Sequence, residues 1–346
     1  MLDVTALGEI LIDFTPCGDC DGIPIFAQNP GGAPLNVLAQ NALLGGKTAF
    51  IGKVGADVFG DDLRRMMANN DINTQGLVIS KDVHTTLAFV QLDSKGERSF
   101  CFYRNPGADI LLRKEEVAAD LIRNSHIFHF GSLSTTSEPS RSATYEALRT
   151  AKEAGCIISY DPNYRAPLWE SEEVAIKAML DLMPYADILK VSDDEMKLLT
   201  GTDDFDEGSR KLADYGITFV CVSCGSEGAY YRRGNEFGKV PAFEVCAVDT
   251  NGAGDAFLGA IHYQIRKKSL ADLKQMPRNE LEAIIRFANA AGALAVLKKG
   301  AIPAMANMEM ICSFLEQKDR WAANQVRSIR SAKTNHQHIN GIVPLI

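Results

Sequence analysis

The sequence lacks a hydrophobic run long enough to cross a membrane. The best candidate, "FANAAGALAVL", is interrupted by Asn289 and Gly292, whereas a membrane-spanning helix needs about 20 consecutive apolar residues. The opening segment, "MLDVTALGEILIDF", carries the acidic residue Asp3 and none of the basic residues that begin a secretion signal. These absences predict a soluble, cytoplasmic protein that has no membrane partner.

An excess of positive charge is also missing. Lys and Arg number 36 against 44 Asp and Glu, which gives a formal net charge of -8 at pH 7. Because proteins hold nucleic-acid phosphates chiefly through clustered Lys and Arg, we expect no nucleic-acid partner. The 346 residues are 46% hydrophobic, which is enough for a large core in one α/β unit or in two domains.

The eight cysteines do not combine into a complete metal site or a redox motif. "CGDC" (Cys17, Cys20) has the spacing of a redox pair or of half a zinc site, but neither a helix nor a second pair follows closely. Cys221 and Cys224 lie three apart in a strand-like run, so they point to opposite faces of a strand. We therefore expect free thiols in a reducing compartment.

What the sequence does contain is an alternation of strand and helix patterns. Strand-like runs, among them "VTALGEILID", "TAFIGKVG", "CIISYD" and "DILKV", alternate with stretches of helical spacing. One helix is predicted from Ala33 to Leu43, ended by Gly45 and Gly46. This order predicts a three-layer α/β/α fold whose central sheet is mainly parallel, with ligands bound at the carboxyl ends of its strands.

One segment breaks the alternation. "HTTLAFVQLD" and "RSFCFYR" are joined by the turn "SKGE" and predict a hairpin with no helix between its strands. The segment after Asp13 is irregular and can supply further strands. This pattern predicts either a small antiparallel β lid over the main sheet, formed by residues of roughly 12–30 and 84–104, or an ordinary edge hairpin.

Two segments are candidates for binding phosphate. "LGGKT" ends like a P-loop, but Asn41 occupies the first glycine position, and the order of helix then strand is the reverse of what a P-loop requires. "DTNGAGDAF" (Asp249 to Phe257) lies between a strand-like run and a helical pattern. It therefore places Gly252, Ala253 and Gly254 at a helix N-terminus, where free N–H groups and the helix dipole attract anions.

Asp255 falls in the first turn of that helix, where the same field favours its ionised form. An ionised carboxylate beside an anion hole suits a kinase, which needs a base for a hydroxyl proton and donors for the charge of the transferred phosphoryl group. Asp255 can equally complement the helix dipole while the glycines form only a turn. The residues by themselves leave both interpretations open.

"DTNGAGDAF" resembles the second signature, D-T-x-G-A-G-D-x-F, of the ribokinase-like (PfkB) family of carbohydrate kinases. "GGAPLNVLAQNALLGG" resembles the first signature, and "IGKVGADVFGDDL" follows it as in the family. The resemblance runs from Leu7 to about Ala304. It implies an ATP-dependent sugar kinase domain over residues 1–317 with the β lid as part of its site. Residues 318–346 lie beyond the resemblance, and they predict a basic C-terminal tail because they carry Lys318, Arg320, Arg327, Arg330 and Lys333 against Asp319 alone.

The resemblance also assigns roles to individual residues. It implies that Asp255 is the catalytic base and that Gly252, Ala253 and Gly254 form the anion hole. Sugar-binding roles fall on Asp13, Gly31, Gly32, Asn36, Arg104, Asn163 and Arg165. Nucleotide-binding roles fall on Lys190, Ser223, Gly225, Gly228 and Asn289. Cation-binding roles fall on Glu195 for Mg²⁺ through water, and on Asp249 with the backbone of Ala295, Lys298 and Gly300 for K⁺.

Several of these assignments have alternatives. Ser192 replaces the asparagine of the family's N-x-x-E motif, and Glu195 can complete a helix capping box with Ser192, alone or together with the metal-binding role. Asn289 can be a polar residue at a helix boundary. Arg104 and Arg165 can form surface or interface ion pairs.

"FCFYRNPGAD" and "DPNYRAPLW" resemble segments of fructokinases. The resemblance implies phosphorylation of the 6-hydroxyl of D-fructose, and the alternatives are a kinase for 2-keto-3-deoxygluconate or for aminoimidazole riboside or a nucleoside. A kinase-like protein that only binds partners is a further alternative, but the signature residues are intact. A lid with an exposed sheet face also predicts a homodimer formed through the lid.

Overall fold

Two sheets organise the chain in a computed structural model that describes residues 1–92 and 98–320. The larger sheet has nine strands in the order β13-β12-β11-β10-β9-β8-β1-β4-β5. Its strands, in chain order, are β1 (Leu2–Leu7), β4 (Thr48–Gly55), β5 (Ile72–Ser80), β8 (Ser125–Gly131), β9 (Ile157–Asp161), β10 (Ile188–Ser192), β11 (Phe219–Ser223), β12 (Ala229–Arg233) and β13 (Glu236–Val240). All pairs from β5 to β11 are parallel, and β12 and β13 add an antiparallel edge.

The strand order reverses at β1. The chain passes from β1 to β4 and β5 on one side, and the strands from β8 onward extend the sheet on the other side. In a parallel sheet, the carboxyl end of the strand at such a reversal opens into a crevice between the flanking connections. The topology therefore places a binding crevice at the end of β1, next to Gly8 and Glu9.

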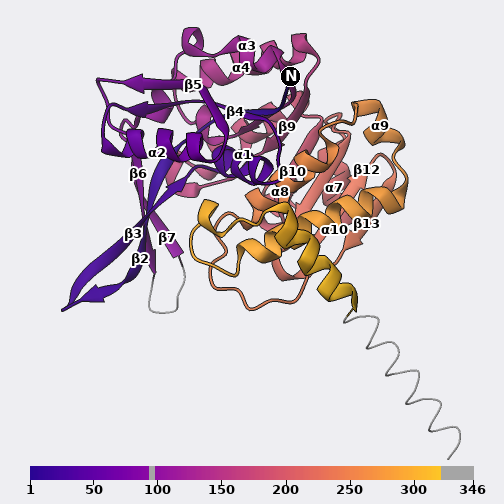
Figure 1. Cartoon of the computed structure of the whole chain (residues 1–346). Helices are drawn as coiled ribbons and strands as arrows, with labels where there is room; N and C mark the ends of the chain where they lie inside the picture. The colour runs from indigo at the N-terminus through magenta and orange to yellow at the C-terminus, as the bar shows by residue number, and fades with distance from the viewer. Residues whose placement is uncertain (93–97, 321–346) are drawn as a thin grey trace, which may run out of the picture.

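Helices cover both faces of the large sheet (Figure 1), as the alternation predicts. Neighbouring strand residues such as Ile127 and Phe128, or Ile157 and Ile158, enter different hydrophobic clusters because successive side chains point to opposite faces. One face carries α1 (Ala33–Leu43), α2 (Val58–Asn69), α8 (Ala253–Ile265) and α10 (Arg278–Ala295). The other carries α3 (Ala119–Arg123), α4 (Ser140–Ala154), α5 (Glu172–Leu182), α6 (Asp193–Thr200) and α7 (Phe205–Ala213).

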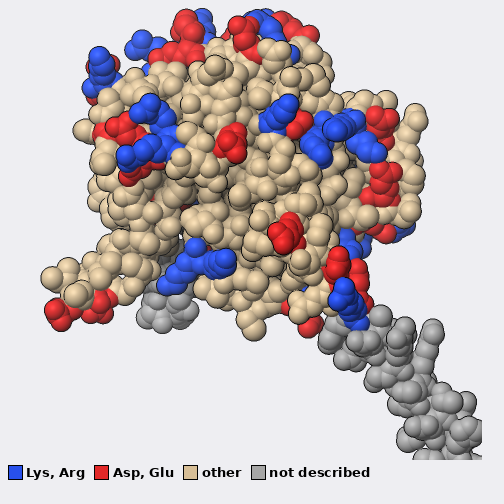
Figure 2. All heavy atoms as spheres, viewed as in Figure 1, with Lys and Arg blue, Asp and Glu red and all other residues tan. Residues whose placement is uncertain are grey.

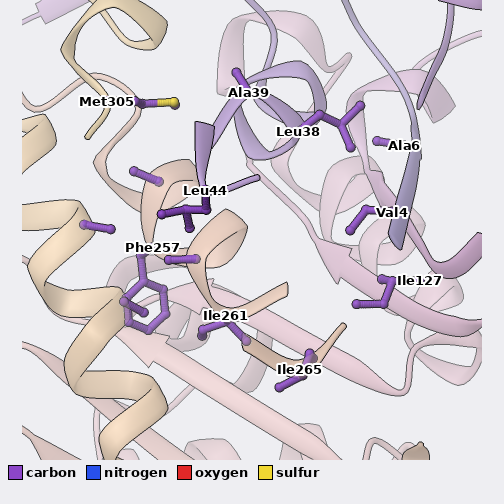
Figure 3. Close-up of a cluster of buried hydrophobic side chains, with 14 of the residues drawn as sticks. Val4, Ala6, Leu38, Ala39, Leu44, Ile127, Phe257, Ile261, Ile265 and Met305 are labelled. Carbon is purple, nitrogen blue, oxygen red and sulfur yellow. The ribbon is translucent and has the colours of Figure 1, made fainter. Parts of the chain in front are cut away.

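Helix α8 is fixed by its apolar stripe, whose members Phe257, Ile261 and Ile265 are spaced four residues apart and are almost fully buried (Figure 3). Each such side chain contributes on the order of 1.5–3 kcal/mol on burial. The helix packs between α1 and α10. This packing holds the N-terminus of α8, and with it Asp255, in one position relative to α1.

The second sheet is a lid of four strands that projects from the body of the protein (Figure 1). Its order is β3-β2-β6-β7, and its strands are β2 (Leu11–Cys20), β3 (Ile23–Gly31), β6 (Thr86–Leu92) and β7 (Arg98–Tyr103). The pairs β2–β3 and β6–β7 are antiparallel, as expected, whereas the central pair β2–β6 is parallel. The segment is thus a separate small sheet and not an edge hairpin; the turn "SKGE", predicted between its two strands, lies outside the described residues.

The two faces of the lid differ. Asp13 and Phe102 face the crevice at the end of β1, and the next residues, Phe14 and Tyr103, point to the outer face because the side chains of a strand alternate. One aromatic ring from each lid strand joins a cluster on that face. Phe89 is at its centre, with its ring centroid 4.8 Å from that of Phe14, 5.7 Å from that of Phe26 and 5.4 Å from that of Tyr103.

The face of the protein seen in Figure 2 carries mixed charge. Figure 2 shows acidic and basic side chains interspersed over the face in view. Within residues 1–92 and 98–320, no helix combines the length and apolar character that crossing a membrane would require. All eight cysteines lie in this part of the chain, and their thiols are free. Of the basic tail expected over residues 318–346, positions 321–346 lie outside the described residues.

Candidate active site

Seven of the residues predicted for the site line a single cavity beneath the lid. They are Asp13, Gly32, Asn36, Asn163, Arg165, Gly252 and Asp255. The residues come from the lid, from the start of α1, from the segment after β9 and from the start of α8. The cavity therefore lies at the carboxyl ends of the strands, at the reversal of strand order that the fold predicts for a ligand.

Asp255 is the third residue of α8, and Asn36 on α1 donates a hydrogen bond of 2.8 Å to its Oδ2. Enclosure by protein atoms and repulsion from Asp161 raise the pKa of Asp255 to about 6, although Lys190, Asn36 and Arg165 favour the ionised form. Burial, which the position in the helix does not reveal, therefore offsets the groups that favour the ionised form. A carboxylate with this pKa is still largely ionised at neutral pH and is a stronger base than an ordinary aspartate.

Asp13 lies in β2 at the root of the lid, and its carboxylate occupies the space above Gly31. A Cβ atom added at Gly31 would collide with Oδ2 of Asp13. Burial raises the pKa of Asp13 to about 6; Arg165 opposes this rise, and Asp255 and Asp249 add to it. Gly31 is thus required by the position of Asp13, an observation that the sequence motif alone does not explain.

Gly32 and Gly252 are both helix N-caps with left-handed backbone conformations, which glycine adopts without strain. Their φ angles are 114° and 75°. A Cβ at Gly32 would collide with the carbonyl oxygen of Glu9, and a Cβ at Gly252 would lie 2.7 Å from Cβ of Ala301. These close approaches let α1 and α8 both begin at the cavity, where their first N–H groups have no acceptor within the helix.

Lys190 brings positive charge to the start of α8. Its Nζ lies 3.0 Å from the position that a Cβ of Gly254 would occupy, and it donates a 3.0 Å hydrogen bond to Oδ2 of Asp161. Burial lowers the pKa of Lys190, but the carboxylates of Asp161, Glu195 and Asp255 raise it above its ordinary value overall. The ammonium group therefore stays charged beside the predicted anion hole.

Asp161 ends β9 and positions the residues that follow it. Its Oδ1 accepts a hydrogen bond of 3.1 Å from the backbone N–H of Asn163, whose φ of 48° is left-handed. This turn brings Asn163 and Arg165 to the cavity, as predicted. Asp161 was not itself predicted as a site residue, although its position at a strand end was the available signal.

Glu195 forms the capping box that was the alternative to a metal-binding role. Its backbone N–H donates to Oγ of Ser192 at 3.1 Å, and its Oε2 accepts from the N–H of Ser192 at 2.8 Å. Oε1 accepts a further hydrogen bond of 2.7 Å from the N–H of Tyr164. Each carboxylate oxygen keeps a second lone pair, so these bonds fit a contact to Mg²⁺ through water.

Asp249 is buried and connects the start of the "DTNGAGDAF" segment to the segment after α10. Its Oδ1 accepts from the N–H of Asn251 at 2.9 Å and its Oδ2 from the N–H of Gly300 at 3.0 Å. The N–H groups of Val248 and Asp249 both approach the carbonyl of Val296. The carboxylate of Asp249 and the carbonyl of Val296 thus bind backbone N–H groups of this segment, and the K⁺ site predicted at Asp249 stays a prediction.

Arg104 does not line the cavity with the other predicted sugar-binding residues. Its guanidinium is buried and pairs with Asp109, with Nε 2.8 Å from Oδ2, and its Nη2 donates to the carbonyl of Leu133 at 2.9 Å. Asp109 also accepts from Oγ1 of Thr86 at 2.5 Å. The ion pair therefore fastens β6 and the end of β7, the base of the lid, to the body of the protein.

The predicted nucleotide residues make structural contacts. Asn289 lies inside α10, not at its boundary, and its Nδ2 donates to the carbonyls of Val240 and Pro241 at 3.0 Å each. Oγ of Ser223 donates to the carbonyl of Val191 at 3.3 Å. Gly225 and Gly228 have positive φ angles, and a Cβ at Gly228 would collide with the carbonyl of Val240. Asn289 and Gly228 thus contact the chain at the end of β13, where the segment that leads to α8 begins.

Comparison with known proteins places the chain in context. Residues 1–308 match the model of the pfkB family of carbohydrate kinases. The chain is 45% identical to probable fructokinase-2 of Arabidopsis thaliana, over 90% of this chain and 95% of the relative. It is 44% identical to fructokinase-2 of Oryza sativa subsp. japonica, over 87% of this chain and 90% of the relative.

Solved structures are similar over the same range. A fructokinase from Xylella fastidiosa with bound ATP has a TM-score of 0.85 and 34% identity, and the match covers 92% of this chain and all of that one. A fructokinase double mutant from Vibrio cholerae O395, in a form with fructose, ADP and potassium ion bound, has a TM-score of 0.82 and 32% identity, covering 90% and 98% of the two chains.

Proposed function

Because the chain belongs to the pfkB family of carbohydrate kinases, we propose that it transfers the γ-phosphoryl group of ATP to the 6-hydroxyl of D-fructose. The observation that carries this proposal is the hydrogen bond between Asn36 and Asp255 in a polar cavity at the positive end of α8. The choice of fructose is supported by relatives named fructokinase. The similar Vibrio cholerae fructokinase, in its fructose, ADP and potassium form, adds further support.

In this mechanism Asp255 takes the proton of the 6-hydroxyl. The sugar oxygen forms a bond to the γ-phosphorus while the bond from that phosphorus to the departing ADP oxygen breaks, and the proton remains on Asp255. Asn36 holds the carboxylate in place through its Nδ2. The N–H groups at Gly252, Ala253 and Gly254, together with the ammonium of Lys190, stabilise negative charge that spreads over the phosphoryl oxygens.

The remaining polar residues of the cavity would hold the sugar. Asp13 is an acceptor for hydroxyls from the lid side, and Asn163 and Arg165 approach from the segment after β9. Arg165 also offsets the negative charge of the two aspartates, since its proximity lowers the pKa of both Asp13 and Asp255. Because Phe102 lies on the inner face of the lid, the lid can exclude water that would otherwise accept the phosphoryl group.

The nucleotide and cations would bind on the opposite side of Asp255 from the lid. We assign ATP to the turns at Gly225 and Gly228 and to the segment that Asn289 supports. Glu195 would hold Mg²⁺ through water, and the ion would offset the charge of the ATP phosphates when bound. Asp249 and the carbonyls near Ala295, Lys298 and Gly300 would hold K⁺, which keeps the segment before α8 in its binding conformation.

We also propose that residues 1–317 form one kinase domain in the cytoplasm and that two copies pair through their lids. Pairing is supported by apolar side chains on the lid that are exposed in one copy, with Phe26 exposed by 40%, Ile25 by 43% and Tyr103 by 64%. A reducing compartment is supported by exposed free thiols, among them Cys17 and Cys20. Residues 318–346 would be a basic extension of this domain.

The test is a coupled assay for ADP release with Mg²⁺ and ATP. D-Fructose, 2-keto-3-deoxygluconate, aminoimidazole riboside and adenosine are compared as acceptors, each with and without K⁺. We expect selective turnover of fructose and stimulation by K⁺. Turnover of another acceptor would replace fructose but keep the mechanism, and no turnover with any acceptor would favour a protein that only binds partners.

A further inference from the structure

Glu9 is a buried carboxylate at the point where the strand order reverses. It lies two residues beyond the end of β1 and two residues before the start of β2, so it joins the central sheet to the lid. Only 3% of its surface is exposed, yet it lines the same cavity as Asp13, Asn36 and Asp255. The end of such a strand is where ligands bind in open parallel sheets.

The two carboxylate oxygens of Glu9 differ in their partners. Oε1 accepts a hydrogen bond of 2.9 Å from the N–H of Ala33 in the first turn of α1. Oε2 is buried and has no hydrogen-bond partner among the described residues. Burial raises the pKa of Glu9 to about 7, although the N–H groups of Glu9 and Ala33 and the charge of Arg104 oppose the rise. A buried polar atom without a partner is costly, so it calls for an explanation.

A second buried oxygen, on Asn36, also lacks a hydrogen-bond partner among the described residues. Nδ2 of Asn36 is bonded to Asp255, but Oδ1 of Asn36 has no partner within the described parts of the chain. Ala33, which holds Glu9, and Asn36 stand three residues apart and therefore on one face of α1. Two unpartnered oxygens thus lie along one wall of the cavity, and a ligand with several hydroxyl groups would satisfy both.

We propose that Glu9 is a substrate-binding residue whose Oε2 hydrogen-bonds a sugar hydroxyl other than the one that is phosphorylated. The inference rests on the proposed function, since it needs a polyhydroxylated acceptor in this cavity. Asn36 contacts Asp255, so its end of the wall belongs to the reacting hydroxyl. Glu9 is bonded to Ala33, which precedes Asn36 by three residues on α1. It therefore selects an acceptor that carries a second hydroxyl group near Ala33.

The experiment compares the wild type with Glu9→Ala and Glu9→Gln. The acceptors are fructose and fructose analogues that each lack one hydroxyl other than the 6-hydroxyl. Glu9→Ala should raise the KM for fructose about tenfold or more while it leaves the KM for ATP unchanged. Glu9→Gln keeps an oxygen for Ala33 and a hydrogen-bonding group at Oε2, so it should fall between the wild type and Glu9→Ala.

The analogues separate a substrate contact from a structural role. With the wild type, the KM of one analogue should exceed that of fructose by about the factor that Glu9→Ala causes for fructose. With Glu9→Ala, the KM of that analogue should rise no further, because the contact is already lost. Asp57→Ala is the matched control, because Asp57 also accepts an N–H at a helix start, that of Gly60 at 2.9 Å, but does not line the cavity. This control should discriminate among the analogues as the wild type does.

Two results would overturn the inference. The first is an unchanged KM for fructose in Glu9→Ala, or an equal rise in KM for every analogue together with a raised KM for ATP. Either outcome would limit Glu9 to supporting α1. If Glu9→Ala does not fold, the same comparison is made with Glu9→Gln. A wild-type protein that phosphorylates none of the acceptors would instead refute the proposed function, and with it this role. Failure of the proposed function therefore appears in the wild type, and failure of the inference only in the variants.

Discussion

Asn36 and Asp255 are 219 residues apart in the sequence, and Nδ2 of Asn36 lies 2.8 Å from Oδ2 of Asp255. The hydrogen bond joins the first turns of α1 and α8, two helices that pack against each other and begin at the same cavity. It also connects the two sequence signatures physically. Asn36 of the first signature thereby positions Asp255 of the second, the residue that we propose as the base.

Asp255→Asn tests the proposed base. The amide keeps the size of the side chain but accepts protons poorly, so kcat should fall by at least about 10²–10⁴-fold, the contribution typical of a general base. Fructose binding should stay close to that of the wild type, because Asp13 and Arg165, which line the cavity and which we propose to hold the sugar, are unchanged. Steady-state kinetics and calorimetry with fructose measure the two effects, and near-normal turnover would exclude Asp255 as the base.

The pH dependence should report the same group. With pKa values raised to about 6 for both Asp255 and Asp13, kcat/KM for fructose should decrease as the pH falls through about 6, because the base must be ionised. The two carboxylates repel each other, so the measured pKa belongs to the pair. The Asn36 hydrogen bond lowers the pKa of Asp255, so Asn36→Ala should move this limb of the profile to higher pH.

If the acid side of the pH profile of kcat/KM stays at the same pH in Asn36→Ala, its assignment to Asp255 is wrong. Asn73→Ala is the control, because the side chain of Asn73 bonds only near the surface, to Gln75. Its profile should match that of the wild type. The comparison therefore separates loss of a hydrogen bond to the base from the general effect of removing an asparagine.

The fold was predictable because its signal is local. Strand and helix patterns alternate along the chain, and the residues on either side of a strand, such as Ile157 and Ile158, enter opposite cores. The glycines at Gly32 and Gly252 also mark helix starts in the sequence itself. The parallel pairing of β2 with β6 was not predictable, because it depends on which strands meet after folding.

The electrostatics of the site were less accessible to sequence analysis. The helix field at Asp255 follows from its position in the chain, but the burial and the charge of Asp161 that raise its pKa depend on residues that are distant in sequence. Likewise, Arg104 is five residues from Asp109, yet no pattern indicates that the two form a buried ion pair. Glu9 was not predicted, since its relevance depends on an oxygen left without a partner in three dimensions.

Gly31→Ala tests whether Gly31 makes room for Asp13. The added methyl group would collide with Oδ2 of Asp13, so the carboxylate must move and the KM for fructose should rise about tenfold or more, the loss of one hydrogen bond to a charged group. Gly201→Ala is the control: its φ is 71° and its Cβ would meet no described atom within 4 Å. That variant should lose stability but keep its KM, and an unchanged KM in Gly31→Ala would refute the explanation.

Asn289→Asp tests whether Asn289 supports the nucleotide segment instead of contacting adenine alone. The carboxylate cannot donate to the carbonyls of Val240 and Pro241, which Nδ2 of Asn289 now bonds at 3.0 Å each. Unpartnered buried carbonyls cost about 1–3 kcal/mol, so the free energy of unfolding without ATP should fall by about that amount. The KM for ATP should rise, while the KM for fructose should change little because Asn289 does not line the sugar cavity.

Denaturant unfolding without nucleotide separates the two roles of Asn289. A residue that only contacts adenine would leave this stability unchanged and would raise the KM for ATP alone. Asn73→Asp is the matched control, because it makes the same chemical change at a site where solvent can replace the lost hydrogen bond. If Asn289→Asp is as stable as this control, the two carbonyl contacts do not hold the segment between β13 and α8, and the adenine contact predicted from the sequence is favoured.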